Sequence, residues 1–227
     1  LRRLDGRKLV DAVRGFMLPI VDGRSLPDEP GILFMRGRQA AVPFMTGGNS
    51  FEGSVMPDSG VTPAMFKEML GDDLPDLREA YAEDFKVGED FGIARIFGDY
   101  RYLLSARVLA GAMAEVGRPG WLYYVALTPA QRPAAWPGTP HAYDAALLFG
   151  NAAAANASAR ALGARLRERW IAFARHGSPQ VDGRPTWPAS PSGADEWMVF
   201  AEEDAARSAV IGRRLDLLER NYRRRLP

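Results

Sequence analysis

The feature that most constrains the fold is a helix pattern that leads directly into a buried strand pattern near the middle of the chain. Apolar residues recur on one face of a predicted helix over 101–116, and Gly117, Pro119 and Gly120 interrupt the pattern. Residues 121–127 are aromatic, β-branched or otherwise apolar, which is typical of a buried strand. Because a helix that leads into such a strand is typical of parallel sheets, we expect an α/β fold.

Weaker patterns on both sides continue this alternation. A short apolar strand is predicted at 41–45, where a glycine pair ends it, and a long helix at 158–176, where a Gly-x-Pro sequence stops it. The remaining predicted elements are helices within 62–116, a late strand at 197–200 and a charged helix at 215–225.

Composition excludes several classes of function. The 29 basic and 28 acidic side chains leave a net charge of +1, so a nucleic-acid partner is not expected. The absence of cysteine excludes disulfides, thiol nucleophiles and cysteine-based zinc sites. No apolar run approaches the roughly 20 residues that cross a bilayer, and we expect a soluble protein of the bacterial cytoplasm or a secreted one. A signal peptide, if present, is expected upstream of Leu1.

Two candidate catalytic side chains follow predicted strands at their carboxyl ends, where reactive groups collect in open parallel sheets. Glu52 follows the strand at 41–45, and His141 follows the strand at 121–127 through a proline-rich loop. A histidine that acts as general base needs a carboxylate on its other ring nitrogen to fix the tautomer and stabilise the imidazolium. Taken alone, each residue also fits an ordinary role, as a helix-capping carboxylate or a loop histidine.

Three separated blocks resemble the type B carboxylesterase and cholinesterase family, in that family's order. The first runs from Pro19 to Gly53 and ends in a sequence similar to the family's Gly-x-Asn-x-x-Glu-Gly acid motif. The second, residues 138–150, resembles the histidine motif, with an acidic residue three positions after the histidine and a Phe-Gly close. The third, residues 170–179 with Trp187 and Pro188, resembles the family's tryptophan-containing helix and its downstream Trp-Pro.

This resemblance implies the carboxyl-terminal portion of an α/β-hydrolase sheet, with later parallel strands and a helical insertion. It assigns Glu52 as the triad acid, His141 as the general base and Asp144 as a support of the histidine loop. The family's Gly-x-Ser-x-Gly nucleophile turn occurs nowhere in the chain, so the serine is expected upstream of Leu1. The implied activity is hydrolysis of carboxylic esters, with no metal or organic cofactor.

The same resemblance implies a division of the chain into three parts. Residues 1–53 would end the core sheet with the acid motif, 54–116 would form a helical insertion along the substrate gorge, and 117–227 would supply the last strands and the histidine loop. Phe51 and Phe91 are candidate lining residues for an ester substrate. Later strands alone would leave apolar edges exposed, so we expect the missing amino-terminal half or a second copy of the chain as partner.

Two alternatives to an enzyme half stay open at this point. A cholinesterase-like adhesion or binding module would keep the fold without catalysis, and an upstream Gly-x-Ser-x-Gly turn would argue against it. The presence of both Glu52 and His141 favours the enzyme. The chain could also be a proteolytic product or a cloned segment.

Other polar groups receive structural interpretations. His176 lies in the last turn of its predicted helix, where a cation interacts favourably with the helix dipole. A metal site formed by His141, Asp144 and His176 is disfavoured because the usual ligand spacing is absent. The arginines between 213 and 225 are interpreted as a solvated helix face, partly balanced by Asp216 and Glu219.

Overall fold

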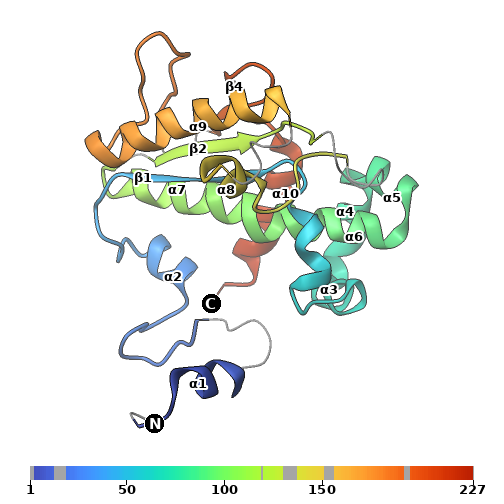
Figure 1. Cartoon of the computed structure of the whole chain (residues 1–227). Helices are drawn as coiled ribbons and strands as arrows, with labels where there is room; N and C mark the ends of the chain where they lie inside the picture. The colour runs from blue at the N-terminus through green and yellow to red at the C-terminus, as the bar shows by residue number, and fades with distance from the viewer. Residues whose placement is uncertain are drawn as a thin grey trace.

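The core of the fold is a four-stranded mixed sheet. A computed structural model of the chain describes residues 3–12, 19–118, 120–129, 137–150, 156–191 and 195–226. The sheet order is β1-β2-β3-β4, in which the first three strands are parallel and β4 is antiparallel to β3 (Figure 1). The strands are β1 (Phe44–Asn49), β2 (Gly120–Val125), β3 (Glu196–Phe200) and β4 (Ala205–Ser208). The predicted α/β class is therefore confirmed.

Helices connect the parallel strands. Helices α1 (Gly6–Ala12) and α2 (Pro30–Met35) precede β1, α8 (Tyr143–Leu148) and α9 (Ala157–His176) lie between β2 and β3, and α10 (Gly212–Arg224) follows β4. The segment between β1 and β2 is described almost throughout, lacking only residue 119, and its described elements are all helical. They are η1 (Glu52–Asp58), α3 (Pro63–Leu70), η2 (Gly71–Asp73), α4 (Leu74–Ala80), α5 (Ala82–Val87), α6 (Glu89–Gly98), η3 (Asp99–Leu104) and α7 (Ser105–Glu115).

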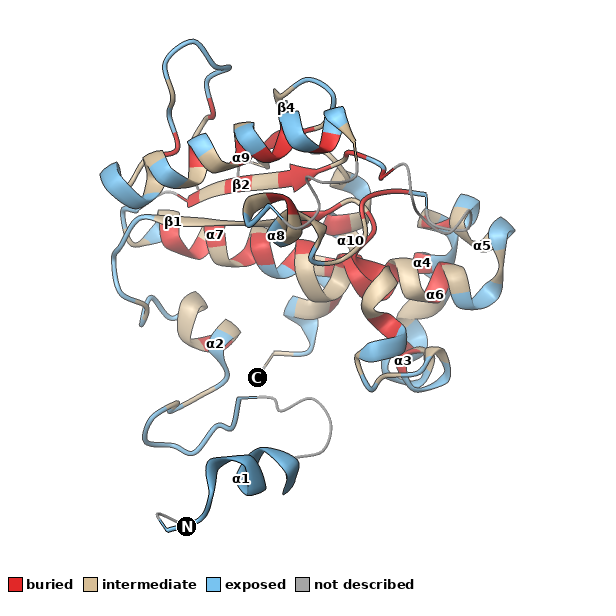
Figure 2. Ribbon diagram, viewed as in Figure 1, coloured by how far each residue is buried: buried red, intermediate tan, exposed pale blue. Residues whose placement is uncertain are grey.

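The two faces of the sheet bury two separate hydrophobic cores. Along β2, Leu122 and Tyr124 join the core shared with α7 and α10, whereas Val125 joins the core under α8 and α9. In β3, Trp197 joins the first of these cores and Met198 joins the second. This alternation follows from the two-residue period of a strand. Figure 1 shows α9 on one side of the sheet and α7 on the other, and Figure 2 shows the buried residues concentrated between these layers.

Helix α9 has the boundaries that its sequence signals predict. The Asn156 side chain caps the amino end by accepting a hydrogen bond from the Ala159 amide at 2.7 Å. At the carboxyl end, Gly177 adopts a left-handed φ of 67° and its amide donates to the Phe173 carbonyl. His176 lies exposed in the last turn, as predicted.

Strand β1 differs from the prediction, which ended it at Met45. The strand continues through Gly47 and Gly48 to Asn49, so the glycine pair lies within the strand and does not terminate it. A Cβ atom at Gly47 would lie 2.0 Å from the Tyr123 carbonyl oxygen. The glycine is therefore required by close packing against β2, which is a tertiary contact and not a turn.

Most arginines of α10, and Arg225 directly after it, lie exposed as the sequence suggested, but they also have partners that the sequence did not indicate. They form ion pairs with carboxylates of the helical segment between β1 and β2, from which they are more than 120 residues distant in sequence. The pairs are Arg213–Glu79 at 3.0 Å, Arg214–Asp84 at 2.7 Å, Arg220–Asp76 at 3.5 Å, Arg224–Asp73 at 2.6 Å and Arg225–Asp73 at 2.6 Å. Helix α10 is thus joined to that segment by charge as well as by the apolar contacts of Leu215 and Leu218.

The amino-terminal part of the chain makes little contact with the core. Helix α1 contains no buried residue, and Figure 2 shows it as exposed and set apart from the sheet. Val10 and Ile20 are each 72% exposed. None of the helices in the described segments is long and apolar enough to cross a membrane.

We predict that α9 is stabilised chiefly by the face that packs on the sheet. Leu166→Ala should lower the free energy of unfolding by about 2–5 kcal/mol, because Leu166 is fully buried and its truncation leaves a cavity. Ile171→Ala on the same helix is the control, since that side chain is 49% exposed and its loss should cost less than about 1 kcal/mol. Urea unfolding curves would measure both, and equal losses would contradict the packing described here.

Candidate active site

Backbone hydrogen bonds bring the loops after β1 and β2 together. Asn49 lies opposite Val125 in the parallel register, and the Ser50 amide continues the ladder by donating to the Val125 carbonyl at 2.8 Å. One residue later, the Phe51 amide donates to the Thr139 carbonyl at 2.8 Å. Thr139 donates from its hydroxyl to the Leu127 carbonyl at 2.7 Å. The residues that follow these two bonded loops are therefore neighbours in space, although they are far apart in sequence.

Those neighbours are the predicted acid and base. The Nδ1 atom of His141 lies 2.5 Å from Oε2 of Glu52. The Glu52 residue is only 3% exposed, whereas the His141 side chain is 32% exposed. With Nδ1 bound to a carboxylate, the neutral imidazole carries its proton on that nitrogen and leaves Nε2 as the basic atom. The hydrogen bond to Glu52 raises the pKa of His141 above its ordinary value, despite the opposing effect of burial.

Asn49 supplies donors to the other oxygen of the buried acid. Oε1 of Glu52 accepts hydrogen bonds from the Asn49 amide at 2.6 Å and from its side-chain Nδ2 at 3.0 Å. A buried carboxylate needs such donors, because an unpaired charge in the interior costs several kcal/mol. Glu52 is therefore fixed on both of its oxygens.

Asp144 contacts this arrangement through Asn49. Its Oδ1 accepts a hydrogen bond from Asn49 Nδ2 at 2.9 Å, and its Oδ2 accepts one from the Tyr123 hydroxyl at 2.9 Å. Asp144 thus links α8 to Asn49 in β1 and to Tyr123 in β2. Asp144 acts on His141 through space, as a charge that raises the pKa of the imidazole after the larger effect of Glu52.

The backbone around His141 is also constrained. The His141 amide donates to Oγ of Ser54 at 2.8 Å, which ties the histidine loop to η1. The next residue, Ala142, has a left-handed φ of 61°, a conformation that costs a non-glycine residue roughly 1–2 kcal/mol. Such strain is found where the surrounding structure fixes a functional geometry, and here it turns the chain from the histidine into α8.

Sequence reasoning missed Tyr102, whose ring lies against the imidazole. The two ring centroids are 4.6 Å apart, with an angle of 42° between the planes. Tyr102 belongs to η3, a π-helical turn, and such turns are frequent at functional sites. The helical periodicity over 101–116 contains no signal for it, because an extra residue in one turn leaves the amino-acid pattern nearly unchanged.

The absence of a side chain at Gly48 leaves room for the Glu52 carboxylate. A Cβ atom there would lie 2.8 Å from Oε1 of Glu52 and 2.8 Å from Cδ2 of Leu103. Any larger residue would push the carboxylate away from Asn49 or push β1 away from η3. The second glycine of the pair is therefore required by the site itself, whereas Gly47 is required by the sheet.

The two predicted substrate-lining residues lie beside the pair. Phe51 and Phe91 stack with their ring centroids 5.4 Å apart and their planes inclined by 19°. The Phe51 residue is 3% exposed, and the Arg95 guanidinium lies 5.6 Å from the centre of its ring. Phe91 is half-buried. Their role in binding a substrate stays a prediction.

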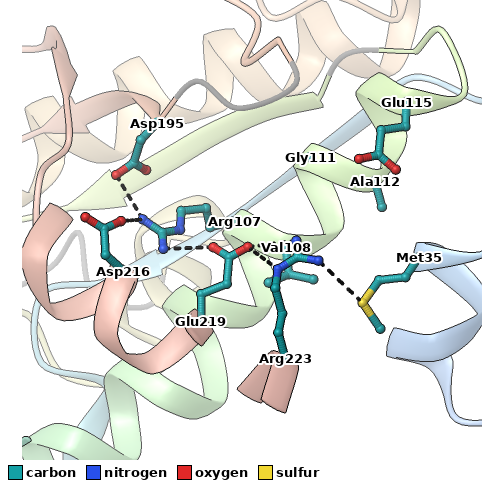
Figure 3. A pocket seen from close by; sticks show the side chains of 10 residues that line it. All are labelled: Met35, Arg107, Val108, Gly111, Ala112, Glu115, Asp195, Asp216, Glu219 and Arg223. Atoms are coloured by element: carbon teal, nitrogen blue, oxygen red, sulfur yellow. Dashed lines mark hydrogen bonds and ion pairs between the residues drawn. The ribbon is translucent and has the colours of Figure 1, made fainter. Parts of the chain in front are cut away.

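A pocket between α2, α7 and α10 offers no competing site. Its central Arg107 pairs with Asp195 at 3.4 Å, with Asp216 at 2.8 Å and with Glu219 at 2.8 Å, as Figure 3 shows. The pocket lining includes no histidine, and its two arginines, Arg107 and Arg223, are paired with acidic residues of the same lining. Within the described segments, no group of three His, Cys, Asp or Glu side chains could hold a metal ion.

Comparison with known proteins assigns a family to this arrangement. A profile described as the carboxylesterase family matches residues 1–216 of the chain. Fumonisin B1 esterase of Sphingopyxis macrogoltabida is 26% identical over 187 residues, which cover 76% of this chain and 35% of that esterase. Para-nitrobenzyl esterase of Bacillus subtilis (strain 168) is 25% identical over 203 residues, which cover 83% of this chain and 40% of the relative.

Solved structures give the same result for the fold. A PNB esterase structure matches with a TM-score of 0.70 and 24% identity, over 89% of this chain and 44% of its own. A thermophilic PNB esterase matches with a TM-score of 0.69 and 21% identity, over 93% of this chain and 46% of its own. The predicted α/β-hydrolase fold is thereby confirmed. The chain spans less than half of the length of these relatives and structures.

We predict that Asp144 and Tyr123 are energetically coupled. Tyr123→Phe should lower the free energy of unfolding by about 1 kcal/mol in the native background and by much less in an Asp144→Ala background, because the hydroxyl then has no carboxylate to lose. Tyr143→Phe is the matched control, since no hydrogen bond joins Tyr143 to Asp144 in the structure. Chemical denaturation of the four members of the cycle measures the coupling, and strictly additive losses would show that the contact is not formed.

Proposed function

Because the chain belongs to the carboxylesterase family, we propose that it supplies the acid and the general base of a serine-dependent carboxylic ester hydrolase. The observation that carries this proposal is the 2.5 Å contact between His141 Nδ1 and the buried carboxylate of Glu52. In the described part of the chain, no group is bonded to Nε2 of His141, so the basic nitrogen is free to face a nucleophile. The chain itself contains no Gly-x-Ser-x-Gly turn.

In the proposed mechanism, a serine hydroxyl outside this chain attacks the acyl carbon of the ester. Nε2 of His141 takes the hydroxyl proton, and Glu52 stabilises the imidazolium that forms. The imidazolium then returns the proton to the departing alcohol, which leaves an acyl-enzyme. A water molecule, deprotonated by the same nitrogen, releases the carboxylic acid and restores the serine. Every proton in the cycle passes through Nε2, so the reaction needs no cofactor.

The proposal includes a partner that completes the sheet. Among the described strands, β1 pairs only with β2, and the backbone groups along its other edge are left without a strand. Parallel strands are normally buried within a sheet, so an exposed parallel edge is a template for another strand. We propose that the amino-terminal half of the same protein covers this edge, with a second copy of the chain as the other possible occupant. By the same proposal, the helical segment 54–116, which includes Phe91, walls the path to the site together with Phe51.

No specific observation favours a non-catalytic adhesion module. A binding module has no use for a histidine whose tautomer is fixed by a buried carboxylate. The four groups that hold this pair, from Asn49, Ser54, Tyr102 and Asp144, would likewise be unexplained.

We predict that hydrolysis of a short-chain nitrophenyl ester requires both the chain and the amino-terminal half proposed as its partner. The chain alone should not exceed the buffer rate, because it lacks a nucleophile. Co-expression with a family amino-terminal half that carries the serine should give turnover, and His141→Ala should reduce that turnover by about 10³-fold or more. His176→Ala is the control and should leave the rate unchanged. Turnover by the chain alone that disappears in His141→Ala would contradict the proposal.

The same assay should show a defined pH dependence. His141 must be neutral to accept the serine proton, so kcat/KM should fall as the pH drops through the pKa of this imidazole in the free enzyme. Because the hydrogen bond to Glu52 raises that pKa, the midpoint should lie above 6.5, the ordinary value for histidine. A rate that does not change between pH 5 and pH 8 would exclude His141 as the base.

We further predict that the chain is not a free monomer. Size-exclusion chromatography with light scattering should find it either self-associated or bound to a co-expressed amino-terminal half, because an uncovered β1 edge leaves backbone groups and apolar side chains exposed. A stable, soluble monomer of the chain alone would contradict this prediction.

A further inference from the structure

A buried cation on α6 contacts the turn that carries the acid. Arg95 donates a hydrogen bond from its guanidinium to the Ser50 carbonyl oxygen. The same guanidinium lies 5.6 Å from the centre of the Phe51 ring. Its side chain is only 14% exposed. Ser50 and Phe51 are the two residues that immediately precede Glu52, and the mechanism proposed above does not use Arg95.

Resting on the proposed function, we propose that Arg95 is a positioning residue, which holds the Ser50–Phe51 turn so that the Glu52 carboxylate faces His141. Arg95 acts through the backbone of the turn and touches neither the imidazole nor a reacting atom.

The backbone of α6 is close enough to make this contact rigid. A Cβ atom at Gly53 would lie 2.2 Å from the Ala94 carbonyl oxygen, and one at Gly98 would lie 2.2 Å from the Gly53 amide nitrogen. Helix α6 and η1 therefore touch backbone to backbone, with glycine at the points of contact. Arg95 directly follows Ala94 in the sequence. Its side chain therefore reaches the turn from a part of the α6 backbone that is held in place by this contact.

Acidic groups also interact with the guanidinium of Arg95. Arg95 Nε lies 3.6 Å from Oδ1 of Asp84, and Oδ2 of the same carboxylate pairs with Arg214 on α10 at 2.7 Å. The buried Asp99 accepts a hydrogen bond from the Tyr81 hydroxyl at 2.9 Å. Burial by itself would lower the pKa of Arg95, but the combined electrostatic effect of Asp99, Tyr124, Asp84 and Tyr81 raises it above its ordinary value, so the group stays charged. These acidic groups therefore help to fix the orientation of the Arg95 guanidinium at the Ser50–Phe51 turn.

The direction in which the pKa of His141 changes when Arg95 is removed distinguishes a positioning role from a simple effect of charge. A nearby cation opposes protonation of an imidazole, so deletion of the charge alone would raise the pKa of His141 or leave it unchanged. Loss of positioning would loosen the hydrogen bond that His141 donates to Glu52, which is the main cause of the raised pKa, and would therefore lower the pKa of His141. The charged groups that act on this imidazole are Glu52 from η1, Asp144 from α8 and Arg101 from η3. Arg95 is not among them, so its removal should act through position.

The test is a proton titration of the two histidines by NMR, in protein labelled with ¹³C-histidine. Only His141 and His176 contribute signals, and the exposed His176 serves as an internal reference. In Arg95→Met, the pKa of His141 should move down from its native value toward that of Glu52→Gln, which marks loss of the carboxylate charge beside the imidazole. Arg214→Met is the matched control. It removes a cation from the same group of charges without contact to Ser50 or Phe51, and it should leave the titration of His141 unchanged.

The outcomes separate this inference from the proposed function. A His141 pKa in Arg95→Met that equals or exceeds the native one would overturn the positioning role. An equal drop in Arg214→Met would also overturn it, since the effect would then belong to the whole group of charges. If Arg95→Met does not fold, Arg95→Lys decides. A lysine keeps the charge, but its single ammonium cannot bind Asp84 and the Ser50 carbonyl together, so a smaller drop is expected and no drop contradicts the inference. The titration needs no turnover, so absence of esterase activity would contradict the proposed function alone.

Discussion

The site depends on the parallel register of β1 against β2. Asn49 opposite Val125 sets the position at which both strands end, and the hydrogen bonds of Ser50 and Phe51 extend the ladder into the two loops. A slip of one residue would turn Asn49 to the other face of the sheet and break its contact with Glu52. Glu52 and His141 meet because of this register. Their relative position is therefore fixed, although they lie far apart in the sequence.

Burial of the acid is balanced by donors from several elements. Moving a carboxylate out of water costs several kcal/mol, and hydrogen bonds from charged or neutral donors must offset that cost. Glu52 receives such bonds from β1 through Asn49 and from the histidine loop through His141. Gly48 leaves the volume that the carboxylate occupies. Gly48 and Asn49 thus meet one requirement: the charged carboxylate of Glu52 must be buried in a confined space.

The sequence was most informative where the signal was local. The aromatic run of β2, the apolar strand β3 and the capped helix α9 were predicted within a residue or two, because burial and capping are encoded in neighbouring residues. Strand β4 was missed, since its residues are half-buried or exposed and it forms only as a partner of β3. Motif resemblance singled out Glu52 and His141, which the structure places in contact. Tyr102 and Arg95 were not singled out, because their contacts join residues tens of positions apart and leave no mark on periodicity.

The groups that hold the pair come from two separate parts of the chain. Asn49, Tyr123 and Asp144 belong to the sheet and its histidine loop, whereas Tyr102 and Arg95 belong to the helices between β1 and β2. Helix α10 joins the two parts, since its arginines bind that helical segment while its apolar face packs on the core below the sheet. The geometry of acid and base is consequently formed by contacts within this chain. A nucleophile from elsewhere would then meet an imidazole that is already oriented, and little further ordering would be needed for the proton transfer.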